Sequence, residues 1–135
     1  MSFSNAAETA VLNQIFKGTA LPWNSNTNLW LALHTADPAE AGTAITSEAT
    51  YTGYARIPIA RSTGFDVTGA VVSNVALAQF PLCTGGVNTV THVSIVDTAS
   101  GAGNIIVSGT LNASYLVQNG YQPQFNAGVL SFTLD

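Results

Sequence analysis

Charged residues are scarce in this sequence. Asp, Glu, Lys and Arg make up 7% of its 135 residues, against about 25% in an ordinary soluble domain. The hydrophilic part of the surface must therefore come mainly from Ser, Thr, Asn, Gln and Gly. A free monomer normally uses many mixed charges for solubility, so a nearly uncharged surface is typical of a protein that is covered in an assembly.

Among the charged residues, the cationic side chains are the rarer kind. Lys17, Arg56 and Arg61 oppose seven acidic residues and leave a net charge of -4. Binding to a phosphate backbone requires clustered Lys and Arg. We therefore expect no direct nucleic acid partner.

A single cysteine, Cys83, excludes an intramolecular disulfide framework and a cysteine-based zinc site, because each needs a second thiol. No apolar run approaches the ~20 residues that span a bilayer. The N-terminus also lacks the basic start and apolar stretch of a signal peptide. These features predict a soluble protein with no membrane partner, assembled in a reducing cytoplasm.

Internal repeats and linkers are missing too, so residues 1–135 are expected to form a single domain. A chain of this length can bury roughly two thirds of its unfolded surface, which is enough for a stable core without disulfides or a structural metal.

One clear helix is predicted between Phe3 and Gly18, at about residues 5–17. Asn5 can cap it, with Glu8 three residues later, and Gly18 offers a left-handed stop. Its apolar face is expected to consist of Val11, Leu12, Ile15 and Phe16.

The next ordered segment, Asn28–His34, reads as a buried strand in the middle of a sheet. The apolar segment is too short for a helix, because Asp37 and Pro38 end it. Residues Ala39–Gly53 have no firm period, which predicts a long loop with at most a short edge strand. Loops of that length usually carry function or contacts.

Beyond Gly53 the pattern indicates β structure throughout. Pro58 should lie at an edge or a bulge because it cannot donate to a ladder. Gly64 and Gly69 bracket a predicted turn, and Ser100–Gly103 is a predicted hairpin loop. The strands are expected at Tyr54–Ala60, Ala70–Phe80, Val87–Asp97, Ile105–Leu111, Tyr115–Val117 and Val129–Leu134.

Short strands with Gly-rich turns predict an all-β fold. We expect a β-sandwich (jelly-roll-like) or an open barrel over about residues 28–135, with one short N-terminal helix.

Few residues suit catalysis. A Cys/His hydrolase could combine Cys83 with His34 or His92, since a thiolate needs a neighbouring base. However, Cys83 lies in a turn between strands, and an isolated cysteine is most often a small buried apolar residue. We therefore expect no enzyme and no cofactor.

The two histidines do not have the spacing of metal ligands. A zinc site needs three or four convergent ligands, whereas His34 and His92 are far apart in the sequence. Each is expected to be half-buried and satisfied by a backbone carbonyl, and no metal site is predicted.

Aromatic residues supply the candidate interface. Trp23, in a loop with Pro and Asn, is predicted to contact a partner together with Tyr51, Tyr54 and Arg56, which surround Gly53. The alternative is that Tyr54 and Arg56 pack and pair within the domain. Carbohydrate stacking by Trp23, Tyr51 or Tyr121 is a further alternative.

Several stretches together resemble a known family. They are Ser4–Leu12, Leu29–Pro38 with the letters LALHTADP, Tyr51–Arg56 with GYAR, Phe80–Gly86 and Thr91–Ile95. In this order they are similar to small virion proteins of tailed bacteriophages. Members of that family are described as tail fibre, minor tail or capsid decoration (cement) proteins. The resemblance implies a virion location and a structural, non-enzymatic role.

The position within the virion is open at this stage. A sequence without heptads, collagen repeats or β-helical repeats does not build a fibre shaft. This favours a cement protein on the capsid surface, which bridges major capsid proteins and contacts copies of itself as a dimer or trimer. The alternative is a tail tip or tail-fibre-associated protein that binds a host glycan.

Overall fold

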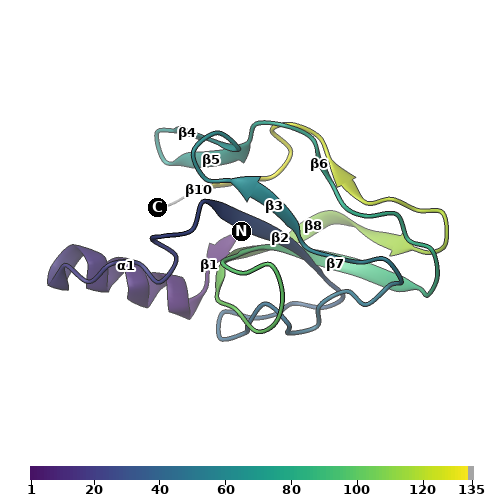
Figure 1. Ribbon diagram of the computed structural model, residues 1–135, viewed down its shortest axis with the longest axis horizontal. Helices are drawn as coiled ribbons and strands as arrows, with labels where there is room; N and C mark the ends of the chain where they lie inside the picture. Colours follow the sequence, from purple (N-terminus) through teal and green to yellow (C-terminus); the bar gives the residue numbers. More distant parts are fainter. Residues whose placement is uncertain (134–135) are drawn as a thin grey trace.

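A five-stranded antiparallel sheet forms the base of the structure, a computed structural model that describes residues 1–133 (Figure 1). Its strand order is β1-β8-β7-β2-β3. The strands are β1 (Ser2–Phe3), β8 (Ile105–Val117), β7 (Asn88–Val96), β2 (Asn28–His34) and β3 (Ile57–Ala60).

The predicted mid-sheet strand is confirmed as β2, which pairs with β7 on one side and β3 on the other. Leu31 and Leu33 point to one face of the sheet and are fully buried. Pro58 lies opposite Trp30 in β3, the outer strand, where a missing N–H is tolerated. The edge position predicted for this proline is also confirmed.

Two small sheets form a second layer over the first (Figure 1). One has the order β10-β5-β4 and the other pairs β6 with β9. Their strands are β4 (Phe65–Thr68), β5 (Val71–Asn74), β6 (Ala78–Gln79), β9 (Gln124–Phe125) and β10 (Ser131–Thr133).

The main core lies between these two layers. It combines Leu31, Leu33, Val93 and Ile95 from the large sheet with Phe125 from β9 and Phe80, which directly follows β6. The prediction of an all-β fold with one N-terminal helix is thus confirmed. The second layer is divided, because its strands belong to two separate sheets.

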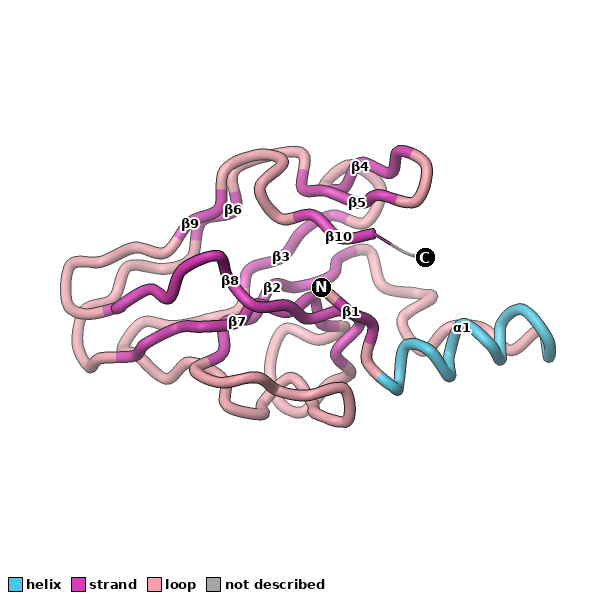
Figure 2. Tube along the Cα trace, turned by 180° about the vertical axis from the view of Figure 1, so that it is seen from behind, coloured by secondary structure: helices cyan, strands magenta, loops and turns pink. Residues whose placement is uncertain are grey.

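The helix α1 (Asn5–Lys17) projects from the body beside β1 (Figures 1 and 2). Its N-cap is Ser4, one residue before the predicted Asn5. The Ser4 hydroxyl accepts the Ala7 N–H at 3.1 Å and donates to the Ile105 carbonyl. Gly18 ends the helix in the left-handed conformation, with φ of 65°, as predicted.

The loop Ala39–Gly53 covers the outer face of the large sheet. Ala44 in this loop is fully buried against Ala32, Val96 and Ile105. Its β contacts are single-residue bridges, such as Thr43 with Asn104. The prediction of a long loop is therefore confirmed.

The single strand predicted at Ala70–Phe80 is wrong, because β5 and β6 belong to different sheets. The buried side chain of Asn74 explains the break. Its amide nitrogen donates to the carbonyls of Ala76 and Asn126, and its oxygen accepts the Leu130 N–H. These bonds turn the chain from one sheet to the next.

Three other strand predictions need correction or comment. β8 is one 13-residue strand, so the separate strand predicted at Tyr115–Val117 is its continuation. β4 lies between Gly64 and Gly69, where a turn was expected. The last predicted strand corresponds to β10, and its final residue, Leu134, lies outside the described residues.

Replacing Ser4 with Ala tests how α1 is attached to the sheet. Loss of the cap and of the buried bond to Ile105 should lower the free energy of unfolding by about 2 kcal/mol, as measured by urea denaturation. Ser2→Ala is the control, since Ser2 is exposed and its change should stay within about 0.5 kcal/mol. Equal effects of the two substitutions would contradict this role of Ser4.

Candidate functional site

A buried ion pair joins Glu48 in the long loop to Arg56 just before β3. Arg56 Nε lies 2.6 Å from Glu48 Oε1, and Arg56 Nη2 donates to Glu48 Oε2 at 2.8 Å. The two side chains are 2% and 15% exposed for Arg56 and Glu48. This two-point geometry is the strongest form of an Arg–carboxylate contact.

Neighbouring groups complete the hydrogen bonding of this pair. Arg56 also donates to the carbonyls of Thr98 and Gly101, at 3.0 and 2.8 Å. The Tyr54 hydroxyl donates to Glu48 at 2.8 Å and accepts the Leu33 N–H at 3.2 Å. We call these residues the Glu48–Arg56 cluster; it fastens the long loop to β2 and to the β7–β8 turn.

Protonation states in the cluster follow from burial and from its charges. Burial raises the pKa of Tyr54 well above its ordinary value, so the phenol stays neutral. Burial alone would lower the pKa of Arg56, but hydrogen bonding to Glu48 and its charge outweigh burial and raise that pKa. The cluster therefore places a neutral phenol beside the guanidinium of Arg56 and its partner Glu48.

The other two predicted interface residues also lie inside the domain. Trp23 is 6% exposed and Tyr51 is 3% exposed. Tyr51 donates its hydroxyl to the Pro81 carbonyl at 2.9 Å, and burial raises its pKa to about 12. The alternative in which Tyr54 and Arg56 pair within the domain describes what the structure contains. An interface role of the four residues stays a prediction.

The histidines face each other across β2 and β7 but have separate partners. His34 is fully buried. Its Nδ1 lies 2.8 Å from the Thr46 carbonyl and must donate, so Nε2 accepts the Ser94 hydroxyl at 2.7 Å. Burial lowers the pKa of His34 and keeps it neutral. His92 is half-buried and bonds to the hydroxyls of Thr91 and Thr110.

The proposed Cys83–His pair does not form. Cys83 is fully buried, and its Sγ donates to the Gly85 carbonyl at 3.2 Å. The ring nitrogens of both histidines bond to other groups, so neither histidine is paired with the thiol. Within residues 1–133, no three His, Cys, Asp or Glu side chains come together as a metal site. The same residues contain no helix of the length and apolarity needed to cross a membrane.

Two of the apolar surfaces on the described part of the chain are candidates for contact. The first, the α1 face, consists of Leu12, Ile15 and Phe16, which are 56%, 65% and 78% exposed. α1 touches the body through Ala7 and Ala10, on the opposite side of the helix. The predicted apolar face also included Val11, which is half-buried, whereas the other three side chains point away from the core.

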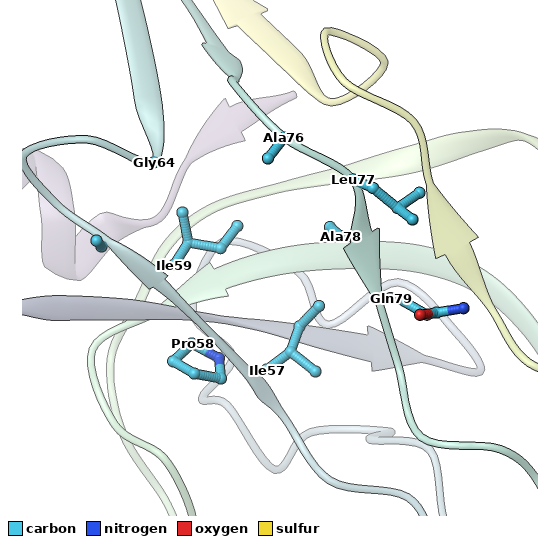
Figure 3. A pocket seen from close by; sticks show the side chains of 9 residues that line it. Ile57, Pro58, Ile59, Gly64, Ala76, Leu77, Ala78 and Gln79 are labelled. Atoms are coloured by element: carbon cyan, nitrogen blue, oxygen red, sulfur yellow. The ribbon is translucent and has the colours of Figure 1, made fainter.

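The second surface is a groove of about 420 Å³ between β3 and β6, which we call the β3–β6 groove (Figure 3). Ile57 and Ile59 point into it from β3, whereas Leu77 and Gln79 point to the other side of their strand. Within residues 1–133, no charged residue lines it. The lining residues are Ile57, Pro58, Ile59, Ala60, Gly64, Ala76, Leu77, Ala78 and Gln79.

Sequence reasoning missed this groove because its walls come from segments that meet only in the folded chain. The surface was not signalled by any local pattern: β3 reads as an ordinary edge strand and β6 as part of a longer strand.

Comparison with known families gives an independent result. Residues 2–133 match the family described as "Podophage GP4 fiber I protein gp80". The chain belongs to this family. A search of curated proteins found no match.

Membership of this fibre family makes the chain a bacteriophage structural protein located in the virion. The family description names a fibre and not a reaction, in line with the structural role that the sequence resemblance implied.

Replacing Glu48 with Ala should destabilise this fibre-family protein by about 3 kcal/mol or more, because Arg56 would remain buried without its counter-charge. Urea denaturation measures the effect. Glu40→Ala is the matched control, since the Glu40 side chain is exposed and its loss should cost under about 0.5 kcal/mol. A cost for Glu48→Ala as small as that of the control would show that the cluster is not a major constraint.

The free energy of unfolding should also decrease as the pH is lowered, because of His34. Its pKa is lower in the folded state than in the unfolded chain, so the unfolded state takes up more protons below about pH 6.5. The contribution of neutral His34 is fully present above that pH and is lost as pH falls, with a slope of at most about 1.4 kcal/mol per pH unit. Urea denaturation between pH 7.5 and pH 5 would measure it. His34→Gln should flatten the profile, and an unchanged profile would assign the effect to other groups.

Proposed function

We propose that this protein is a fibre-associated structural module of a podophage virion, without enzymatic activity, that assembles through apolar contacts with copies of itself and with neighbouring virion proteins. The observation that carries this proposal is the match to a fibre family over residues 2–133. The module would serve as one compact unit of a larger fibre, because the sequence has no repeats from which to build a shaft.

The use of charge in the structure supports contact by apolar surfaces. Arg61 Nη1 donates to the carbonyls of Trp23, Asn24 and Asn26, and Arg56 is held by Glu48. Two of the three cationic side chains are thus occupied inside the chain. Few positive charges therefore remain to attract an acidic partner, whereas the α1 face and the β3–β6 groove offer apolar side chains for contact.

The second candidate is a cement protein that bridges major capsid proteins. The compact, repeat-free chain favours it, because a small rigid domain can add buried area between capsid subunits. The fibre description of the family weighs against it.

Host-glycan binding has less support. Trp23 and Tyr51 are buried, so among the three aromatic residues considered for stacking only Tyr121, at 37% exposed, presents its ring to solvent. The hydrolase alternative has no support, because no histidine bonds to Cys83.

The copy number and position of the protein in purified particles test the proposal. Quantitative mass spectrometry against the major capsid protein should give a few to a few tens of copies, and antibody labelling should mark the tail. Copies on the order of hundreds, labelled over the capsid, would favour the cement protein, since shell lattices repeat their subunits by symmetry. Absence from the particle would overturn both.

A further inference from the structure

We propose that copies of this chain join head to tail, with the α1 face of one copy docked in the β3–β6 groove of the next. The inference rests on the proposed function as a fibre module and names the contact that such a module uses. Both halves of the contact are present in the chain, so the partner is a second copy.

The helix supplies the first half. A helix of 13 residues is marginal in water unless it packs against something. The buried side chains of α1 are the small alanines Ala7 and Ala10, whereas the large side chains of Leu12, Ile15 and Phe16 are mostly exposed. Their i, i+3, i+4 spacing is that of the anchors by which an amphipathic helix binds a hydrophobic groove.

The groove supplies the second half. Its volume of about 420 Å³ and its apolar lining, with Ile57 and Ile59 pointing inward, suit a few aliphatic or aromatic side chains (Figure 3). The part of the chain that the structure describes places no charged group in the groove for docking to desolvate, and the three helix anchors are uncharged as well. Two copies that each carry a net charge of -4 can meet here without bringing like charges together.

The backbone of β3 favours a helix over an added strand as the occupant. The backbone N–H of Arg61 donates to the Thr27 carbonyl. In the β2–β3 register, this bond places the backbone polar groups of Pro58 and Ala60 on the side of β3 that faces away from β2. Pro58 has no N–H to give to a new strand. The Ala60 carbonyl already accepts the Gly64 N–H at 2.8 Å. The outer edge of β3 therefore has few backbone groups available to pair with an added strand. A partner would bind here mainly by packing its side chains, as a helix does.

A helix cannot reach the groove of its own chain. α1 leaves the body at the end opposite to β6 in both views (Figures 1 and 2). Its start is fixed because β1 pairs with β8 and Ser4 bonds to Ile105. The contact is therefore between copies, and since it joins two different surfaces it repeats in a ring or a filament.

The contact is small. One helix in one groove buries less than the ~1,200 Å² of a standard interface, so each contact is weak. Attachment of many copies to one particle would strengthen the array by raising the local concentration.

Two exposed positions allow each half to be broken without disturbing the core. Phe16→Glu changes the helix, and Ala76→Glu changes the rim of the groove, where Ala76 is exposed. Val87→Glu is the matched control, because Val87 is 63% exposed and lies outside both surfaces. Circular dichroism and urea denaturation would establish that all three variants fold as the original chain does.

Sedimentation equilibrium on the full chain, at concentrations up to about 1 mM, measures the association. The original chain and Val87→Glu should form a concentration-dependent series of oligomers. Phe16→Glu and Ala76→Glu should each raise the dissociation constant by about 10- to 100-fold, the loss expected when one large apolar anchor no longer docks.

An equal mixture of Phe16→Glu and Ala76→Glu gives the sharpest result. The intact helix of the Ala76→Glu chain can enter the intact groove of the Phe16→Glu chain, so the mixture should form a one-to-one dimer that does not grow further. A symmetric helix-to-helix contact predicts no such recovery.

The inference is overturned if the original chain stays monomeric up to about 1 mM, if either variant assembles as the original does, or if the mixture stays monomeric. Its failure is separate from that of the proposed function. Monomers in solution from a protein found in the tail would reject only the docking, and head-to-tail oligomers of a protein absent from particles would reject only the fibre role.

Discussion

The buried Glu48–Arg56 ion pair is the constraint on which the arrangement of the outer loops depends. Charges removed from water need several hydrogen bonds in addition to each other. This requirement brings the carbonyls of Thr98 and Gly101 onto the guanidinium and the Tyr54 hydroxyl onto the carboxylate. As a result, three segments distant in the sequence hold fixed positions around β2. The long loop is thereby a fixed covering layer over the large sheet.

The same cluster explains the character of the outer surface. In a chain with three cationic side chains, the use of Arg56 and Arg61 for internal bonds leaves Lys17 as the remaining one. The surface then offers few positive charges by which a partner could be recognised. Specific contact is then left mainly to the shape of apolar surfaces such as the α1 face and the β3–β6 groove, and the groove begins at Ile57, the residue after Arg56.

Local signals in the sequence predicted the elements that depend on local structure. The helix with its apolar face, the buried strand β2 and the edge position of Pro58 follow from periodicity and from the missing N–H of proline. The break after Asn74 depends on bonds to Asn126 and Leu130, more than 50 residues away, and no local pattern contains them. Tyr54 and Arg56 are of residue types that are common at interfaces, which is why the sequence suggested a contact surface. Only the fold of the long loop reveals that Glu48 pairs with them.

An exposed apolar helix is a liability for a free monomer, since large apolar patches promote unspecific association. Here the exposed stripe is limited to three large side chains on one short helix, and the groove that fits it is equally small. Such a pair binds weakly at low concentration and gains strength only when copies are held close together. The chain can therefore stay dispersed after synthesis and become ordered where the growing particle concentrates it. Weak, directional contacts of this kind suit a fibre, because each added copy presents a fresh groove to the next.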